Sequence, residues 1–463
     1  MKPGNQRLKV GLGLLGSGVV GEAVQDIVWE REGKFGEDLE IEIRRVYTRR
    51  PEGKKWHASR PELFTESAEE VIDDPRVEIV VEVLGLDDPS ALPRHRDAIV
   101  RALRNGKSVV TSDKAVLARY GEEIWSEAVR AGRQVRFEAC VGGGIPIIRS
   151  LTESFAAESP EAVFGIVNGT CNYILSQMEK GGKTYDAALA EAQVRGYAET
   201  NPEADVTGAD AEAKLLLLAA VAFGVRIEPG TIWRNGIGDI HAVDFRYAGK
   251  TGASTIKHFA VARRKGNRLQ AFVSPVLVPR ENLLADIDGP TNAICFKGER
   301  SGSGRRGRDC DYILAGPGAG GGPTAVAVLG DVCELARGGG RRFCGLPSLM
   351  PPGAVTLQPE EEIDGSFYLR FVVRDRAGIV GDIGQVFGKL GVNISEIWQL
   401  RHSAEELEDL ARSHRLGTSG GLLPFVMTLE QATLGQMRQA LDLLADRDYI
   451  AVKPVWFPIW RET

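Results

Sequence analysis

Long apolar runs are absent from this chain of 463 residues. The longest run, from Leu215 to Val225, suits a buried helix and is shorter than the roughly 18 apolar residues of a membrane span. The N-terminal residues lead directly into a strand-like run at residue 8, with no apolar signal segment before it. These features argue against an integral membrane protein, and we expect a cytoplasmic location.

Cysteine and histidine are also scarce, and there is no excess of positive charge. The chain has 6 cysteines and 6 histidines, with no C-x-x-C pair and no cysteine beside a histidine at the spacing of zinc ligands. This pattern argues against zinc and predicts reduced, mostly buried thiols. With 57 Lys and Arg against 63 Asp and Glu, the formal net charge is −6. The chain therefore lacks the basic character of proteins that bind nucleic acid or anionic membranes.

Glycine, in contrast, is abundant, with 55 residues. The glycines cluster rather than repeat, which indicates tight backbone turns around ligands and excludes a collagen-like fibre.

The order of predicted elements indicates an α/β protein in three parts. In residues 1–140, apolar strands alternate with helices, the pattern of a doubly wound parallel sheet of Rossmann type, which about 323–345 completes. Residues 141–322 begin with a glycine-rich loop and then mix helices with strands, as in an α+β domain. Residues 346–362 are rich in glycine and proline and indicate a linker. Residues 363–463 show the order βαββαβ of a ferredoxin-like domain.

A dinucleotide-binding fingerprint, G-x-G-x-x-G, fits residues 11–16 between a predicted strand and a predicted helix. We assign Gly11 to the turn, Gly13 to the close approach of a pyrophosphate, and Gly16 to the packing of helix on strand. Leu14 and Leu15 complete this loop, after which the helix N-terminus would offer N–H groups to the phosphates. A glycine-rich turn without a ligand is the alternative.

The end of the second predicted strand indicates which dinucleotide binds. Proteins that bind NAD usually place Asp or Glu there, to hold the ribose 2′-hydroxyl. Here Thr48 is followed by Arg49 and Arg50, and an arginine pairs well with a 2′-phosphate. The sequence therefore favours NADP, and NAD is possible. A solvated basic turn that binds no cofactor is the alternative.

The most specific stretch is residues 192–215, which read A-Q-V-R-G-Y-A-E-T-N-P-E-A-D-V-T-G-A-D-A-E-A-K-L. On a helix, Asp210 and Lys214 are four residues apart and share one face. Glu199 and Asp205 lie in the approach to this helix. The helix beyond is apolar, so Lys214 would lie between a polar site and a dry core, where a lysine can exchange a proton near neutral pH. An exposed helical ion pair is the alternative.

The chain resembles the homoserine dehydrogenases along its whole length. The G-Y-A-E…D…D-x-x-x-K series is the most specific match, and the others follow in order: V-E-V-L-G at 81–85, D-K-A-V-L-A at 113–118, E-A-C-V-G-G-G-I-P-I at 138–147, N-G-T-C-N-Y-I-L at 168–175 and G-P-G-A-G-G-G-P-T-A at 316–325. The tail, D-R-A-G-I-V-G-D-I-G at 375–384, is similar to an ACT regulatory domain. The resemblance implies the monofunctional, NAD(P)-dependent enzyme that interconverts L-aspartate 4-semialdehyde and L-homoserine.

The resemblance also implies roles for matching residues. Lys214 would give a proton to the substrate carbonyl oxygen and take it back in the reverse reaction, and Asp210 would orient the substrate. Glu199 would hold the substrate ammonium. The remaining implied positions are Tyr197, Asp205, Gly169 and Thr170 in the substrate pocket, and Lys114 and Gly318 at the cofactor.

An ion, an effector and a partner are implied as well. Family members can bind a structural sodium ion, here through the carboxylate of Glu138 and carbonyls of Val141, Gly143 and Ile145. The 141–322 domain would bind substrate and form dimers. The ACT-like tail would bind a pathway amino acid, threonine, between paired copies, which implies a homo-oligomer, a dimer or tetramer. A tail that only mediates assembly is the alternative.

The sequence departs from the family pattern at a few places. Asp113 stands where Asn usually precedes Lys114, Leu86 replaces the second of two glycines, and the 300–312 segment is longer and more basic. Two other functions therefore stay open. One is a different amino-acid dehydrogenase of the same fold, and the other is an amino-acid sensor that has lost turnover.

Overall fold

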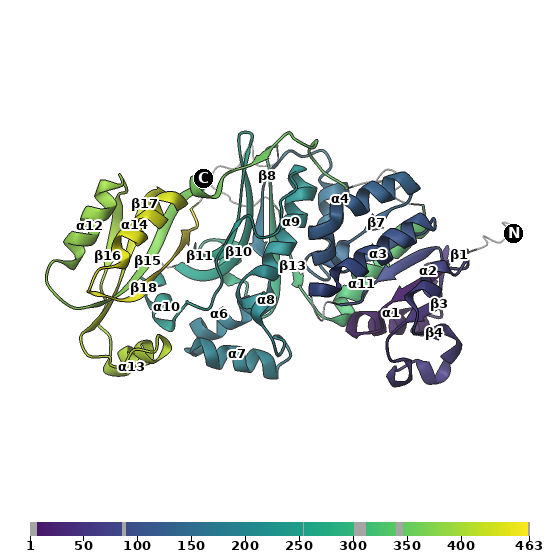
Figure 1. Ribbon diagram of the computed structural model, residues 1–463, viewed down its shortest axis with the longest axis horizontal. Helices are drawn as coiled ribbons and strands as arrows, with labels where there is room; N and C mark the ends of the chain where they lie inside the picture. Colours follow the sequence, from purple (N-terminus) through teal and green to yellow (C-terminus); the bar gives the residue numbers. More distant parts are fainter. Residues whose placement is uncertain (1–6, 86–88, 253, 301–311, 339–345, 462–463) are drawn as a thin grey trace. The chain divides into compact units, whose positions relative to one another are not determined.

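The structure, a computed structural model, describes residues 7–85, 89–252, 254–300, 312–338 and 346–461 (Figure 1). The chain forms two compact units, each built from three segments. Unit 1 comprises Met1–Pro160, Ala213–Pro229 and Leu314–Ala354, and unit 2 comprises Glu161–Glu212, Gly230–Ile313 and Val355–Thr463. No helix in the described ranges is long and apolar enough to cross a membrane.

Unit 1 is organised around a seven-stranded sheet in the order β2-β3-β1-β5-β6-β7, with β4 beside β3. Its strands are β1 (Leu8–Leu15), β2 (Lys34–Phe35), β3 (Leu39–Tyr47), β4 (Phe64–Thr65), β5 (Ile79–Glu82), β6 (Ser108–Thr111) and β7 (Val135–Arg136). Apart from the short antiparallel β2, neighbouring strands are parallel, which confirms the predicted parallel sheet. Parallel strands place their carboxyl ends along one edge, where α/β proteins bind their ligands.

The helices of unit 1 are α1 (Val19–Glu30), α2 (Ala68–Asp73), α3 (Leu92–Arg104), α4 (Lys114–Ala131), α5 (Ile147–Arg149) and α11 (Gly321–Ala336). Helices α1 and α11 pack together, and Val19 lies so close to Gly321 that a Cβ there would be 2.9 Å from the valine side chain. A core of fully buried side chains joins these helices to the sheet, including Leu12, Val24 and Val328. Unit 1 is thus completed by α11, which lies roughly 300 residues after β1 in the sequence.

Unit 2 contains most of an eleven-stranded sheet in the order β13-β12-β8-β10-β11-β18-β15-β17-β16, with β14 and β9 beside β11. Its strands are β8 (Pro160–Ile166), β9 (Trp233–Arg234), β10 (Ser254–Lys265), β11 (Arg268–Pro279), β12 (Thr291–Gly298), β13 (Tyr312–Pro317), β14 (Thr356–Leu357), β15 (Asp364–Arg374), β16 (Ile394–Trp398), β17 (Leu422–Thr433) and β18 (Ile450–Ile459). Its helices are α6 (Gly169–Gly181), α7 (Tyr185–Val194), α8 (Glu203–Val206), α10 (Ala242–Ala248), α12 (Ile379–Lys389), α13 (Ala404–Ser413) and α14 (Leu434–Ala445). Helix α9 (Ala209–Phe223) contains residues of both units.

The last hundred residues follow the order βαββαβ, with one helix, α13, inserted before β17. All neighbouring strands in this part are antiparallel. The boundary predicted at residue 363, however, is not a boundary between compact units, because β18 pairs with β11 through Ile459 and Leu277. The predicted linker at 346–362 also contributes β14 to that sheet, so the tail and the preceding residues share one sheet.

Two features of the sequence lie outside the described residues. Leu86 and most of the basic 300–312 segment belong to them.

Candidate active site

The chain makes a sharp turn at the carboxyl end of β1, where the predicted loop of residues 11–16 ends. The strand ends at Leu15, and Gly16 has φ +115°, which favours glycine. A Cβ at Gly16 would lie 2.5 Å from the carbonyl oxygen of Val83, so β1 and the segment after β5 approach each other closely here.

The roles predicted for Gly11 and Gly13 are wrong, because both residues lie inside β1. A Cβ at Gly11 would be 1.8 Å from the Arg76 carbonyl oxygen, and one at Gly13 would be 2.7 Å from Val71 Cγ1. Their small size therefore serves packing of the strand rather than a turn. Leu14 and Leu15 are fully buried in the same strand. The loop after β1 therefore lies further along the sequence than predicted.

A second fingerprint, G-S-G-V-V-G at residues 16–21, has the register that the fold requires. Gly16 makes the turn, and Gly18 is the N-cap of α1, with nothing within 4 Å of its Cβ position. A Cβ at Gly21 would lie 2.2 Å from the Gly16 carbonyl oxygen, so this glycine permits the helix to pack on the turn. Sequence reasoning missed this match because it shares Gly16 with the one at 11–16.

The basic segment after β3 divides into two pairs. Lys54 lies 3.2 Å from Glu22, and Lys55 lies 2.8 Å from Asp26, so both lysines are tied to α1. Arg49 and Arg50 are exposed at the carboxyl end of β3.

In unit 2, a single asparagine holds two of the predicted carboxylates. The Asn168 Nδ2 amide donates to Asp205 Oδ1 at 2.7 Å and to Asp210 Oδ2 at 2.8 Å. Its Oδ1 accepts from the Cys171 N–H at 2.8 Å and so caps α6. Asn168 is 4% exposed. Sequence reasoning missed this residue, although an asparagine before a predicted helix is a recognised capping signal.

Asp210 and Lys214 are one turn apart on α9, as predicted. Asp210 is half-buried in the first turn of the helix, whereas Lys214 is 8% exposed. The helix continues as an apolar stretch, and its residues 215–223 are all buried. The lysine therefore lies at the border between a carboxylate-rich segment and a dry core.

The other predicted substrate residues gather around the start of α6, with one exception. The Thr170 hydroxyl donates to the Tyr197 carbonyl oxygen at 2.5 Å, and the rings of Tyr197 and Tyr173 have centroids 4.9 Å apart. Gly169 is the first residue of α6, and a Cβ there would lie 2.5 Å from the Pro290 carbonyl oxygen. Glu199, in contrast, is exposed on the loop between α7 and α8.

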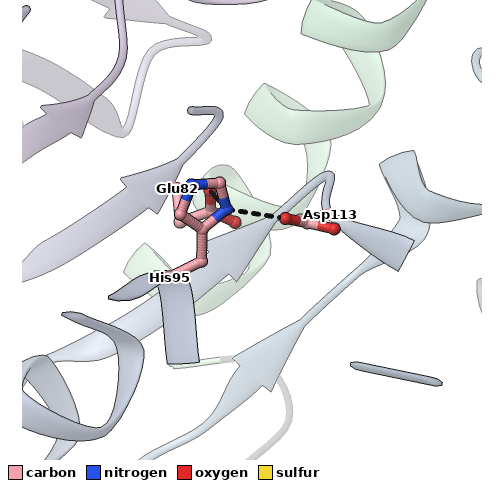
Figure 2. Close-up of side chains that lie close together, drawn as sticks. All are labelled: Glu82, His95 and Asp113. Carbon is pink, nitrogen blue, oxygen red and sulfur yellow. Dashed lines mark hydrogen bonds and ion pairs between the residues drawn. The ribbon is translucent and has the colours of Figure 1, made fainter. Parts of the chain in front are cut away.

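Lys114 begins α4, next to a buried cluster of three titratable side chains (Figure 2). Asp113 caps this helix, because its Oδ1 accepts the N–H groups of Ala115 and Val116 at 3.0 and 3.1 Å. Its Oδ2 lies 2.9 Å from His95 Nδ1. The departure from the family pattern at residue 113 is thus matched by a histidine partner.

Glu138 is 5% exposed and accepts two backbone N–H groups at the start of α5. The amides of Ile148 and Arg149 each donate to its carboxylate at 2.8 Å. Burial, together with the charge of Asp331, raises the pKa of Glu138 to about 7. Burial likewise raises the pKa of Asp331 to about 6.

The two glycine-rich segments of unit 1 lie against each other. The Gly144 N–H donates to the Pro317 carbonyl oxygen at 3.2 Å, and a Cβ at Gly143 would lie 2.6 Å from Gly318. Gly143 has φ +55°, so the backbone turns at this contact. The predicted ion segment and the predicted cofactor residue Gly318 are therefore neighbours.

The chain is similar to known homoserine dehydrogenases in both sequence and fold. A family model described as homoserine dehydrogenase matches residues 146–333, and a model of the homoserine dehydrogenase NAD binding domain matches residues 11–138. A homoserine dehydrogenase from Synechocystis is 34% identical over 458 residues, which cover 97% of this chain and 98% of that protein.

Solved structures agree. The crystal structure of a homoserine dehydrogenase from Thiobacillus denitrificans has a TM-score of 0.82 and 30% identity, and the match covers 98% of this chain and 99% of that one. A hyperthermophilic archaeal homoserine dehydrogenase in complex with NADPH has a TM-score of 0.58 and 27% identity, over 73% of this chain and 99% of that one.

Proposed function

This chain belongs to the homoserine dehydrogenase family, and we propose that Lys214 and Asp210 of α9 carry its proton transfer and its substrate orientation. The enzyme interconverts L-aspartate 4-semialdehyde and L-homoserine in amino-acid biosynthesis. A bound nicotinamide cofactor supplies the hydride. The protein therefore has to orient two reactants and to manage one proton.

Lys214 suits the proton transfer. When the aldehyde is reduced, its oxygen gains alkoxide character, which a nearby ammonium group stabilises before it donates a proton. In the reverse direction the neutral amine accepts the proton of the homoserine hydroxyl. The nearly complete burial of Lys214, at 8% exposure, lowers the effective dielectric around this charge and strengthens the interaction.

The observation that carries this proposal is the amide of Asn168 bound to both Asp205 and Asp210. It holds two carboxylates together on the approach to Lys214, and an amino-acid substrate needs carboxylates for its ammonium group. Tyr197, Thr170 and Gly169 would shape this pocket, and the exposed Glu199 would contact the ammonium from the loop beside it.

The cofactor would bind at the turn of residues 16–21, with its pyrophosphate at the N-terminus of α1. The turn of residues 16–21 thus takes the role first predicted for residues 11–16. Arg49 and Arg50 support NADP, because both are exposed at the carboxyl end of β3, where an arginine can pair with a 2′-phosphate. The NADPH complex of the archaeal relative points the same way. Lys114 and Gly318 would contact the nicotinamide half.

A sodium ion would fit the chemistry of the Glu138 segment. The donors are one buried carboxylate and the carbonyls of Val141, Gly143 and Ile145, and hard cations prefer such oxygens. Burial and the charge of Asp331 raise the pKa of Glu138, and a cation beside the carboxylate would offset that unfavourable effect. Sodium chloride should then raise the unfolding temperature more than choline chloride does, and equal effects would remove the ion from the proposal.

For the tail, we propose binding of a pathway amino acid, threonine, at the start of α12. Gly378 has φ +92° and caps this helix without a side chain, so backbone N–H groups there can receive a carboxylate. Strand β16 is at the end of the sheet order, and such a strand can pair with a second copy. We also propose that this amino acid regulates the enzyme, that the chain forms a homo-oligomer and that it is cytoplasmic. Threonine that neither inhibits the full chain nor raises its unfolding temperature would leave the tail with assembly alone.

The test of the central proposal is the absorbance of the reduced nicotinamide. Purified protein with L-homoserine and NADP⁺ should form NADPH, and more slowly form NADH with NAD⁺. Replacing Arg49 and Arg50 by Ala should narrow the difference between the cofactors, whereas Lys55→Ala should not. Tight binding of an amino acid without reduction of either cofactor would instead favour the sensor.

A further inference from the structure

The buried cluster beside Lys114 contains two acids and one base from three different elements (Figure 2). Glu82 is the last residue of β5 and is 0% exposed; His95 belongs to α3 and is 6% exposed; Asp113 precedes α4 and is 7% exposed. His95 Nδ1 lies 2.9 Å from Asp113 Oδ2 and 3.8 Å from Glu82 Oε1. One ring nitrogen therefore faces both carboxylates.

Hydrogen bonds connect the cluster to the ends of two neighbouring strands. Glu82 accepts the Leu84 N–H at 3.1 Å and the Thr111 hydroxyl at 2.5 Å. The same hydroxyl oxygen accepts the Asp113 N–H at 2.9 Å. The carboxyl ends of β5 and β6 and the first turn of α4 are thus joined in one network.

We propose that His95 is a positioning residue for Lys114: as an imidazolium it pairs with Asp113, the cap of α4, and so holds the turn that begins with Lys114. The inference rests on the proposed contact of Lys114 with the cofactor. Without a cation at His95, two buried carboxylates would repel each other, and the cap would lose a charge-assisted hydrogen bond. Because Lys114 follows the cap directly, a displaced cap displaces the lysine.

The surroundings favour the charged form of His95. Burial lowers the pKa of His95. The hydrogen bond to Asp113 and the charge of Glu82 raise it by more, so that the pKa of His95 is raised overall. The exposed Arg94 on the same helix opposes this rise. Burial and the charge of Asp113 raise the pKa of Glu82 to about 7. The other titratable groups that face the cluster are the thiol of Cys140, which donates to the Thr111 carbonyl oxygen at 3.4 Å, and Lys114 itself.

The test is the affinity for NADPH, followed by nicotinamide fluorescence across the range in which histidine titrates. In the wild-type chain, the dissociation constant should rise several-fold as His95 loses its proton. Asp113→Asn keeps an oxygen to cap α4 but removes the charge, so it should move this transition to lower pH. His95→Asn keeps a donor near the position of Nδ1 but does not titrate, and should flatten the pH profile. His95→Ala removes the donor and should weaken binding at every pH.

Proton NMR of the histidine rings provides an independent readout. The chain has 6 histidines, and His95→Asn identifies the missing resonance. In the wild-type chain, the midpoint of the His95 titration should match the midpoint of the NADPH-binding profile. In Asp113→Asn this midpoint should move to lower pH. Unfolding temperatures of all variants show whether the fold is intact.

A further variant, Lys114→Met, separates failure of this inference from failure of the proposed site. If Lys114→Met leaves NADPH affinity unchanged, the proposed role of Lys114 is wrong. If it weakens binding while folded His95→Asn and Asp113→Asn keep the wild-type pH profile, Lys114 does contact the cofactor and His95 does not position it.

Discussion

Arg370 and Asp244 form an ion pair in which both side chains are fully buried. The pair joins β15 of the tail to α10, whose N-terminus is capped in part by the same carboxylate through the His241 N–H. Tyr368 also donates to Asp244, at 2.7 Å. The tail is therefore joined to the rest of unit 2 by a buried ion pair as well as by strand pairing.

Breaking this pair should be costly. Arg370→Met leaves a buried, uncompensated carboxylate and should lower the free energy of unfolding by about 3–5 kcal/mol. Adding Asp244→Asn should recover part of the loss because it removes that charge. The control is Arg376→Met, which breaks an exposed pair with Asp448 and should cost less than about 1 kcal/mol. Equal costs in denaturant titrations would contradict the argument.

Lys214→Ala should lower turnover by about 10²–10⁴-fold, the usual scale for loss of a general acid. The affinity for NADPH should be unchanged, since the proposed cofactor residues belong to other elements. Steady-state rates and NADPH titrations measure the two effects. A nearly normal rate would transfer the proton role to another group, of which Lys114 is the next candidate.

Asn168→Ser should separate the two roles of this asparagine. Serine can still cap α6, but it lacks the amide that bridges Asp205 and Asp210. Hydrogen bonds to charged groups contribute about 1.5–3 kcal/mol to stability, so the free energy of unfolding should fall by about that amount. Displacement of the two carboxylates should also lower kcat/KM for homoserine about 10- to 100-fold. Asn168→Ala should show the same kinetic loss and a further destabilisation of about 1 kcal/mol from the lost cap. Kinetics indistinguishable from wild type would remove the bridge from the proposed site.

Gly18→Ala should weaken NADPH binding and leave the fold intact, whereas Gly13→Ala should destabilise the fold. Nothing lies within 4 Å of the Cβ position at Gly18, and its φ of −85° suits alanine, so the fold should tolerate the change. NADPH affinity should nevertheless fall about tenfold, or ~1.4 kcal/mol, because the methyl group would occupy the phosphate approach. Gly13→Ala should lower the free energy of unfolding by about 1–3 kcal/mol through overpacking. Weaker binding only in Gly13→Ala would restore the loop at 11–16.

Without a bound cation, the contribution of Glu138 to stability should fall as the pH rises toward neutrality. The pKa of Glu138 is about 7 in the folded chain against an ordinary value of 4.5, so the folded state binds more protons than the unfolded state between these values. Its contribution is complete below 4.5 and is lost as the pH rises through 7. Asp331 acts in the same direction with a pKa of about 6.

Denaturant titrations at several pH values measure this effect. The Glu138 contribution should be on the order of 3 kcal/mol, and Glu138→Gln should remove it from the curve. A wild-type slope in that variant would assign the pH dependence to other groups.

The local patterns of the sequence predict much of this fold, but the register of one motif escapes them. Residues 11–16 and 16–21 both match the dinucleotide fingerprint, and only the end of β1 at Leu15 decides between them. Where a strand ends depends on its neighbours, here the pairing of Leu15 with Tyr47 and Glu82. For α13 the signal was present and missed: Ser403 and Glu406 form a capping box.

Contacts between distant segments account for the rest. The spacing of Asp210 and Lys214 predicts a shared helix face, whereas the bridge from Asn168 depends on how α6 and α9 approach each other. The pair of Arg370 and Asp244 joins residues with no local pattern in common. A sequence pattern cannot reveal such partners, because a buried charge shows its need for a partner but not which one.

The shared sheet has a consequence for how the protein is made. Neither compact unit is a continuous stretch: unit 1 waits for α11, and the β11 edge stays unpaired at Leu277 until Ile459 has left the ribosome. Domains that close early can fold during synthesis, but this chain holds an open strand edge from the completion of β11 until Ile459 has been made. Nascent chains would therefore expose this strand edge until β18 has been made.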